Sequence, residues 1–262
     1  MTVVTSGLIA EFVGLIAKNG TAPGNNSDPT SVWDDTSPVA NDLTLSNLSW
    51  TDTSGWDGDG SAGDPYSVAT DADSSGVTST SSSYDLAVDT AVTTEAWLYV
   101  PTAPTANKSI LSVPADGRRG FCMYLRSTGT LGFQRNNDAT HYRYTSSGEA
   151  AVTSGWHHFV CAYDGAGALR QYIDNALTDV TIGVSGTTTT HMTDPALTFA
   201  YATGGPGYLG ASYRVATIRI YNRALSTGEV DQNYAAGILA STVVGENGFT
   251  GLTVYKNLSG TG

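Results

Sequence analysis

Aspartates gather in one loop-like part of the sequence and are the residues best suited to hold a metal ion. The run from Trp56 to Gly60 reads Trp-Asp-Gly-Asp-Gly and is the densest acidic turn in the chain. Oxygen atoms from flexible loops suit the variable coordination of Ca²⁺. The sequence therefore predicts calcium as a cofactor, with a solvated acidic loop as the alternative. The predicted ligands are Asp57, Asp59, Asp71 and Asp73, with Asp64 nearby.

Tyrosines on or near expected loops and strand ends are the second group that could do chemistry. The C–H face of a sugar stacks on an aromatic ring while its hydroxyls take hydrogen bonds from polar neighbours. Most of these tyrosines are expected to be packing residues. Our candidates for a glycan-binding platform are Tyr142, Tyr144 and Tyr208.

Two adjacent histidines, His157 and His158, invite a metal-binding interpretation. Neighbouring residues of a strand point to opposite faces, so both cannot bind one ion from a regular strand. We therefore expect one of them to lie in the core. No Gly-x-Ser-x-Gly elbow, phosphate loop or dinucleotide fingerprint occurs in the sequence, which argues against those hydrolase and nucleotide-binding classes.

Strands must position these residues. The segment Trp156 to Tyr163 is rich in aromatic and β-branched residues, a Gly-containing turn follows, and Leu169 to Ile173 can return as its partner. This pattern predicts a β-hairpin. Further strands are expected at 7–12, 43–45, 66–69, 93–100, 109–113, 120–126, 129–135, 141–145, 180–184 and around 216–221, with long surface excursions at 18–38 and 71–83.

One short helix is expected near the end of the chain. Ser226 can cap its start and Glu229 can complete a capping box, while Leu225 can pack against Val230. Gly237 can end it. We expect one domain over residues 1–237, followed by a C-terminal extension at 238–262 that is either an extra strand or a docking arm.

Two stretches carry a family resemblance. The hairpin reads Trp-His-His-Phe-Val-Cys-Ala-Tyr and then Gln-Tyr-Ile-Asp-Asn, and the closing segment reads Arg-Ile-Tyr-Asn-Arg-Ala-Leu-Ser-Thr-Gly-Glu-Val. Both resemble laminin-G-like domains of the concanavalin A-like lectin/glucanase superfamily, as does Asn-Asp-Leu-Thr-Leu at 41–45. The resemblance spans about residues 6 to 236 and is weaker between these stretches.

The resemblance implies an all-β fold, a two-sheet antiparallel jelly-roll sandwich with one short C-terminal helix. We expect its layers to pack around Trp97, Trp156 and the pair Ile218 and Ile220. His158 matches a family position whose ordinary role is hydrogen bonding between packed strands. Many such domains also hold calcium near a loop edge, but the aspartates above have no residue-by-residue match to that site.

Catalysis of the glucanase kind is not expected. A retaining glucanase needs two carboxylates about 5 to 5.5 Å apart, and related jelly-roll glucanases take them from a Glu-x-Asp-x-Glu run. The chain contains no such run. Its glutamates are Glu11, Glu95, Glu149, Glu229 and Glu246.

Length and charge narrow the remaining choices. The chain has 262 residues, near the upper end for a single sandwich, and 12 basic against 24 acidic residues give a formal charge of −12. That charge repels nucleic acid and anionic membrane surfaces. No stretch is apolar and long enough to span a bilayer, and no signal peptide is recognised at Met1. The two cysteines, Cys122 and Cys161, are expected to be buried free thiols.

Together these observations predict a non-catalytic, lectin-like binding module. By analogy it resembles bacteriophage decoration, fibre or tail-associated proteins, made in the host cytoplasm and displayed on the virion. Its expected partners are other virion proteins or a second copy of itself, and host glycans. The alternatives are a carbohydrate-active enzyme or its accessory domain, and a bacterial adhesion module on the extracellular surface.

Overall fold

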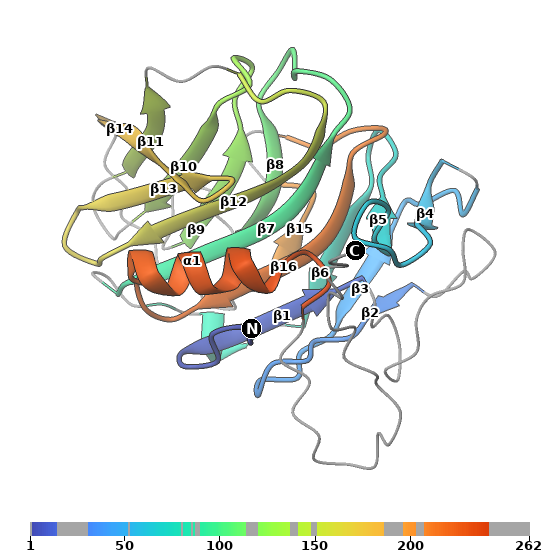
Figure 1. The fold of residues 1–262 in the computed structure, drawn as a ribbon, viewed down its shortest axis with the longest axis horizontal. Coiled ribbons are helices and arrows are strands. Elements are labelled where there is room, and N and C mark those ends of the chain that lie inside the picture. Colours follow the sequence, from blue (N-terminus) through green and yellow to red (C-terminus); the bar gives the residue numbers. More distant parts are fainter. Residues whose placement is uncertain are drawn as a thin grey trace, which may run out of the picture.

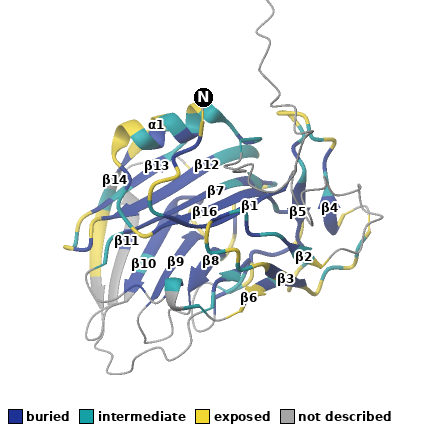
Figure 2. Ribbon diagram, turned by 90° about the horizontal axis from the view of Figure 1, so that it is seen from below, coloured by how far each residue is buried: buried dark blue, intermediate teal, exposed yellow. Residues whose placement is uncertain are grey.

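The computed structural model describes residues 2–14, 31–51, 53–79, 81–84, 86, 90–113, 120–136, 141–147, 151–185, 196–202 and 207–240. In this part of the chain, two antiparallel sheets lie face to face, and one α-helix covers part of the outer side of one sheet (Figure 1, Figure 2). The predicted all-β jelly-roll sandwich with one short helix is confirmed.

The sheet beneath the helix is called the helix-covered sheet. Its strands lie in the order β4 (Gly55–Asp57), β5 (Ser67–Ala69), β16 (Arg214–Tyr221), β7 (Val92–Val100), β12 (Gly155–Tyr163), β13 (Leu169–Ile173) and β14 (Ala176–Ser185). Strand β1 (Leu8–Val13) pairs with residues 217–221 of β16, whereas β5 pairs with residues 214 and 215 of the same strand.

The second layer is called the opposite sheet. Its order is β2 (Val32–Trp33), β3 (Leu43–Ser46), β6 (Ser75–Thr78), β15 (Thr198–Phe199), β8 (Lys108–Val113), β9 (Gly120–Leu125), β10 (Leu131–Asn136), β11 (His141–Ser147) and again β14. Strand β14 thus pairs with β13 through its first residues and with β11 through its later ones, so it joins the two sheets along one side.

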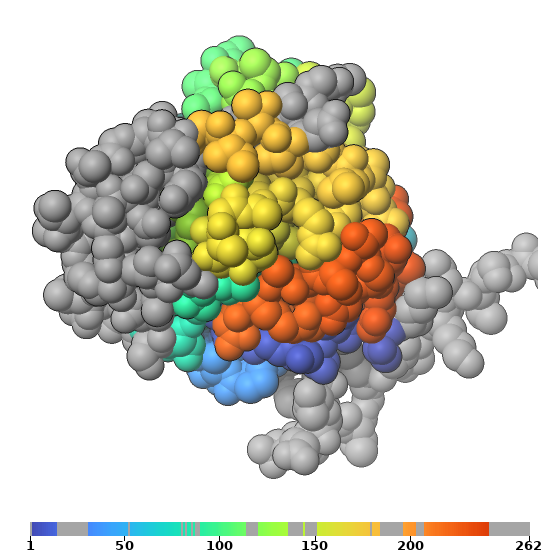
Figure 3. All heavy atoms as spheres, turned by 90° about the vertical axis from the view of Figure 1, so that its left-hand side faces the viewer, coloured from blue at the N-terminus to red at the C-terminus, as the bar shows by residue number. Residues whose placement is uncertain are grey.

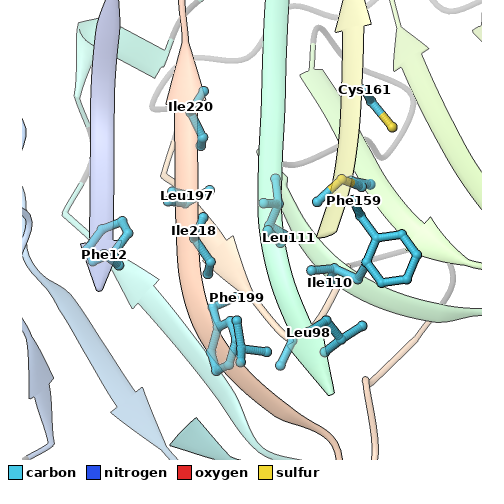
Figure 4. Packing of buried hydrophobic residues seen from close by; sticks show 14 of the residues in the cluster. Phe12, Leu98, Ile110, Leu111, Phe159, Cys161, Leu197, Phe199, Ile218 and Ile220 are labelled. Atoms are coloured by element: carbon cyan, nitrogen blue, oxygen red, sulfur yellow. The ribbon is translucent and has the colours of Figure 1, made fainter. Parts of the chain in front are cut away.

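The core lies between the sheets, where the inward half of each strand's alternating side chains meets the other layer. On β7, Ala96, Leu98 and Val100 are fully buried on the inner face. Ile218 and Ile220 of β16 lie in the same core, as predicted, together with Ile110, Leu111, Phe159 and Phe199 (Figure 4). Burial of this kind contributes about 1.5 to 3 kcal/mol for each large apolar side chain.

The two tryptophans predicted to lie at the centre of the sandwich are on its outer surface instead. Trp97 is opposite His158 and Trp156 is opposite Tyr99, and these residues belong to the outward half of the alternation. The prediction was wrong because an alternating strand with apolar residues on both faces does not reveal which face meets the other sheet. Between the layers lie Trp33 and Trp56.

Residues 71–83, expected to be a surface excursion, contain a strand of the opposite sheet. Strand β6 pairs with β3 and β15, and Thr78 is buried. Gly76 shows why the strand carries so little apolar sequence of its own. The side chain of Leu43, from the neighbouring strand, fills the space beside it, and a Cβ atom on residue 76 would come within 2.2 Å of Leu43 Cδ2. The strand gains its apolar contact from its neighbours, so its own composition looks like that of a loop.

Helix α1 (Thr227–Ala236) forms as predicted. Ser226 accepts a hydrogen bond from the Glu229 N–H, and the Glu229 carboxylate accepts one from the Ser226 N–H, which completes the capping box. Leu225 and Val230 share an apolar cluster beneath the helix, and Gly237 ends it at φ 87°. The other helical segment described is the short 3₁₀ turn η1 (Ser82–Tyr84).

Two further expectations concern the whole chain. Cys122 and Cys161 are buried free thiols, as predicted. Within the described ranges, no helix is long and apolar enough to cross a membrane. The predicted extension at 238–262 lies outside the described residues from position 241 onward.

Candidate functional site

The outer face of the helix-covered sheet carries a group of half-buried aromatic and charged side chains beyond the end of α1. Strand register brings them together, because Tyr99 of β7 pairs with Trp156 of β12 on one side and with Arg214 of β16 on the other. Asp57 at the end of β4 and Asp64 in the β4–β5 turn complete the group. We call these five residues the aromatic–arginine patch.

The aromatic part of the patch is an edge-to-face pair under a cation. The ring centroids of Tyr99 and Trp156 are 5.6 Å apart at an interplanar angle of 66°. The Arg214 guanidinium carbon lies 5.4 Å from the centroid of the Trp156 ring, within the range of a cation–π contact. All three side chains are partly exposed, so the patch offers both ring surface and polar atoms to solvent.

Two carboxylates hold the arginine in place. Arg214 Nη2 lies 2.6 Å from Asp64 Oδ1, and Arg214 Nε lies 3.2 Å from Asp57 Oδ2 and donates to Ser67 Oγ at 3.0 Å. The side chain of Asp64 is 46% exposed and that of Asp57 is 25% exposed. Oxygen atoms of both can therefore accept hydrogen bonds from a ligand hydroxyl.

The predicted calcium ligands do not converge. Asp57 faces the guanidinium of Arg214, a cation that the protein supplies itself. Asp59 is exposed and accepts a hydrogen bond from the Ser61 N–H, which holds the pKa of its carboxyl below the usual value.

The other two aspartates lie on a different turn. Asp71 Oδ2 accepts hydrogen bonds from Ser49 and from the Ser54 hydroxyl at 2.6 Å, and Asp73 is exposed. In the described part of the chain, no three His, Cys, Asp or Glu side chains form a group that could hold a metal ion. Asp57 thus holds Arg214, Asp59 caps its own turn, and Asp71 holds the segment that carries Ser49 and Ser54, so the predicted ligand set is not assembled.

The three predicted glycan-binding tyrosines have different positions. Tyr144 is fully buried, packs against Phe133 and Tyr163, and donates to the Gly167 carbonyl at 3.0 Å. Its ring offers no face to a sugar, and we correct that assignment. Tyr142 lies on β11, but its side chain is outside the described residues.

Tyr208 reaches solvent, unlike Tyr144, the other predicted tyrosine whose side chain is described. It is 37% exposed, and its ring stacks on Tyr201 with centroids 4.5 Å apart and an interplanar angle of 28°. The backbone of the adjacent Gly207 accepts a hydrogen bond from Ser109 of β8, which ties this stacked pair to the opposite sheet. The pair forms a second exposed aromatic surface.

Beneath α1 lies a buried ionic network that is closed to solvent. Arg219 Nε donates to Glu11 at 2.9 Å and Nη1 donates to Glu95 at 2.7 Å, and all three side chains are fully buried. Asn233 of the helix donates to the other Glu95 oxygen at 2.6 Å, and His158 Nε2 lies 3.2 Å from Glu95. His158 is thus the buried histidine of the pair, as predicted.

The pKa of Glu95 follows from these neighbours. Burial alone would raise it, but Arg219, His158 and Asn233 outweigh that effect and lower the pKa to about 2. The carboxylate therefore stays ionised, and the guanidinium separates it from Glu11. Two carboxylates in this arrangement cannot act as an acid and nucleophile pair on a sugar, because neither reaches solvent and Glu95 holds no proton to donate.

Comparison with known proteins agrees with the observed fold. A family model described as the concanavalin A-like lectin/glucanases superfamily matches residues 71–231. The chain belongs to this superfamily. No curated protein matches its sequence.

Several solved structures resemble this concanavalin A-like chain at low sequence identity. The binding domain of botulinum neurotoxin DC in complex with SialylT has a TM-score of 0.57 and 13% identity, over 88% of this chain and 52% of that one. The binding domain of Paraclostridial Mosquitocidal Protein 1 has a TM-score of 0.58 and 13% identity, over 87% and 52%. Trypanosoma rangeli sialidase, with the inhibitor DANA, has a TM-score of 0.53 and 14% identity, over 88% and 33%. The chain therefore spans about half the length of the toxin domains it matches.

Sequence reasoning missed most of the patch of this concanavalin A-like sandwich. Tyr99 and Arg214 were not candidates, and Asp64 was noted only as one acid among several. The spacing of Tyr99 and Trp97 could have identified Tyr99, because residues two apart on a strand share one face. Arg214 lies more than a hundred positions away in the sequence, so only the pairing of β7 with β16 could identify it.

Proposed function

We propose that this chain is a non-catalytic, lectin-like binding module and that the aromatic–arginine patch is its glycan-binding surface. The observation that carries the proposal is the half-exposed Tyr99 and Trp156 pair beside the oxygen atoms of Asp57 and Asp64. Sugars are recognised by this combination, since their C–H faces stack on rings and their hydroxyls donate to carboxylates. The toxin domain solved with SialylT lends support by analogy of fold alone.

The non-catalytic part of the proposal rests on the carboxylates. Glu11 and Glu95 are buried on either side of Arg219, and Glu95 is ionised across the ordinary pH range. The competing proposal, a carbohydrate-active enzyme or its accessory domain, predicts release of reducing sugar from β-glucans. Detection of such release by the purified chain would count against a binding role.

A glycan array run with three proteins tests the location of the site. We expect the wild-type protein to bind, and Trp156→Ala to lose about 2 kcal/mol of binding free energy, roughly thirtyfold in Kd, because a central aromatic residue is removed. Tyr208→Ala is the matched variant on the second aromatic surface and should bind like the wild type. Unchanged melting temperatures would establish that both variants are folded.

The result with Tyr208→Ala also decides between the two surfaces. Loss of binding in Tyr208→Ala alone would move the site to the Tyr201 and Tyr208 pair. Binding retained in both variants would reject both surfaces as glycan sites.

We further propose, on analogy alone, that the module is displayed on a bacteriophage particle after synthesis in the host cytoplasm, with residues 238–262 as its attachment arm to other virion proteins or to a second copy. A truncation that tests this should begin at residue 241, because Thr217 donates to the Ile238 carbonyl and Arg219 donates to Ala240. Undiminished incorporation of the truncated chain into particles would contradict the attachment role. A bacterial surface adhesion module is the alternative setting.

Calcium remains a proposed ligand of the loop aspartates. Asp59 and Asp73 are exposed and could recruit the ion in solution, whereas Asp57 is already paired with Arg214.

A further inference from the structure

A hollow of about 310 Å³ opens at the end of the sandwich where β12, β13 and the start of β14 meet the loop that precedes β12. It lies apart from the aromatic–arginine patch, on the inward face of β12. Figure 3 shows this side of the molecule, with the yellow surface of the β12–β14 region next to α1 in red-orange. The hollow is lined by Ala151, Val152, Thr153, His157, Ile173, Asp174, Ala176 and Thr178.

His157 bridges the two walls of the hollow. Its Nδ1 lies 2.7 Å from Asp174 Oδ2 in the β13–β14 turn, and its Nε2 lies 3.0 Å from the Thr153 carbonyl in the loop. A carboxylate and a carbonyl can only accept hydrogen bonds, so each ring nitrogen must carry a proton to satisfy both contacts. The geometry therefore calls for the imidazolium form of His157.

The surroundings of His157 support that form. Its hydrogen bond to Asp174 raises the pKa of the imidazole above its ordinary value, against the opposing effect of burial. Among the described residues, its other neighbours are the Phe159 ring, at a centroid distance of 5.9 Å, and Leu98, its cross-strand partner on β7. Asp174 is itself fixed, because its second oxygen accepts the His158 N–H at 2.9 Å.

One unpaired polar atom belongs to a residue that lines the hollow. Among the described residues, the Thr178 hydroxyl has no hydrogen-bond partner, and the residue is only 7% exposed. Gln171, its cross-strand neighbour, does not line the hollow; it is fully buried and donates its amide N–H to Cys161, and its carbonyl oxygen has no partner among the described residues. Buried polar atoms are costly to leave unmatched, so this site favours an occupant that brings hydroxyl groups.

We propose that the hollow is a second binding site, for a single neutral sugar unit, and that the His157 and Asp174 pair holds its mouth in the binding shape. Val152, Ile173 and Ala176 offer apolar contact to the C–H face of the sugar. Thr178 and Asp174, whose side chain is 40% exposed, offer oxygen atoms to its hydroxyls. An acidic sugar fits less well, because it would meet Asp174 and a chain of formal charge −12.

Proton binding should control this site. At low pH His157 keeps both contacts, and the loop stays attached to the β13–β14 turn. When the imidazolium loses a proton as the pH rises through its folded-state pKa, one of the two contacts is lost and the mouth loosens. We expect sugar binding to weaken about tenfold between about pH 5 and about pH 8, the equivalent of one charge-assisted hydrogen bond.

The experiment is a titration of amide NMR shifts with methyl glucoside, methyl galactoside and methyl mannoside at both pH values. The Trp156→Ala protein is used so that the aromatic–arginine patch does not contribute, and this separates failure here from failure of the proposed function. We expect saturable shifts at the amides of Ala151 to Thr153 and at Ala176.

Three variants in the same background complete the test. Thr178→Val removes the hydroxyl with little change in shape and should weaken binding about tenfold, whereas Thr44→Val, at an exposed position of β3, should not. His157→Gln should remove the pH dependence. No saturable shift with any of the three sugars would mean that the hollow holds water only, and undiminished binding by Thr178→Val would likewise overturn the proposal.

Discussion

At the scale of single residues, Arg219 organises the outer face of the helix-covered sheet. It is fully buried between Glu11 and Glu95, and its charge is matched within hydrogen-bonding distance on both sides. Burial would lower the pKa of the guanidinium, but the two carboxylates raise it above the ordinary value. A buried charge of this kind is tolerated only while its partners remain, so each carboxylate is a sensitive position for stability.

Glu95→Gln tests this sensitivity. We expect a loss of about 3 kcal/mol in the free energy of unfolding near neutral pH, because Arg219 keeps its charge and loses one partner. Urea unfolding measures the effect. Glu229→Gln is the matched control on the half-exposed capping box and should cost about 1 kcal/mol.

The same carboxylate predicts how stability depends on pH. The pKa of Glu95 is lowered from 4.5 to about 2 in the folded state, so its stabilising effect is fully present above about pH 4.5 and is lost as the pH falls toward 2. The difference between the wild type and Glu95→Gln should therefore shrink across that window. A constant difference down to about pH 2 would contradict the assigned pKa.

Residue types alone could not separate packing from recognition. Tyr144 and Tyr208 both follow short polar stretches, yet one is fully buried and the other stacks in solvent on Tyr201. Trp156 was expected in the core because tryptophan is a large apolar side chain. It lies instead on the outward face of β12, where Arg214 from a distant part of the sequence contacts its ring.

At the scale of elements, the β4–β5 hairpin positions both acids of the aromatic–arginine patch. Gly58 allows this tight turn, since its φ is 101° and a Cβ atom there would come within 2.2 Å of the Pro65 carbonyl oxygen. An L-residue other than glycine is strained at such a φ, and here it would also collide with the backbone. The ion pairs of Asp57 and Asp64 with Arg214 therefore depend on Gly58.

Gly58→Ala should cost about 2 kcal/mol in the free energy of unfolding and weaken glycan binding, because Asp57 and Asp64 shift away from Arg214. Thermal unfolding and array binding measure the two effects. Gly63→Ala, in the same turn, is the control, since a Cβ atom there meets nothing within 4 Å. Equal effects of the two substitutions would show that the turn tolerates a side chain at either position.

Elements with strong local patterns were predictable, and so were the short strands β3 and β5, but four other short strands were not. The strands β7, β12 and β13 and the capped helix α1 follow from patterns contained within a few residues of sequence. Strands β2, β4, β6 and β15 are two to four residues long, and they exist because neighbouring strands supply their hydrogen bonds. Polar sequence in such a strand gives no local signal.

At the scale of the whole molecule, the formal charge of −12 sets how the protein responds to ions. If calcium binds the loop aspartates, millimolar calcium should raise the melting temperature by about 2 to 4 °C, and a chelator should reverse the change. Asp59→Asn with Asp73→Asn should abolish the shift, whereas Asp231→Asn on α1 should keep it. The same melting temperature with and without calcium would end the calcium proposal.

Strand β14 links the two sheets by backbone hydrogen bonds along one side of the sandwich. Because it is hydrogen-bonded to β13 and to β11, the layers cannot part there without breaking the ladder. On the far side, the described residues include no strand shared by both sheets. Aromatic contacts join the layers there: the Trp33 ring of β2 meets Trp56 of β4 edge-on at 5.6 Å, and Phe199 of β15 at 5.8 Å. Opening of the molecule should therefore separate the two sheets on the side where Trp33 and Trp56 pack, while β14 keeps them joined on the other side.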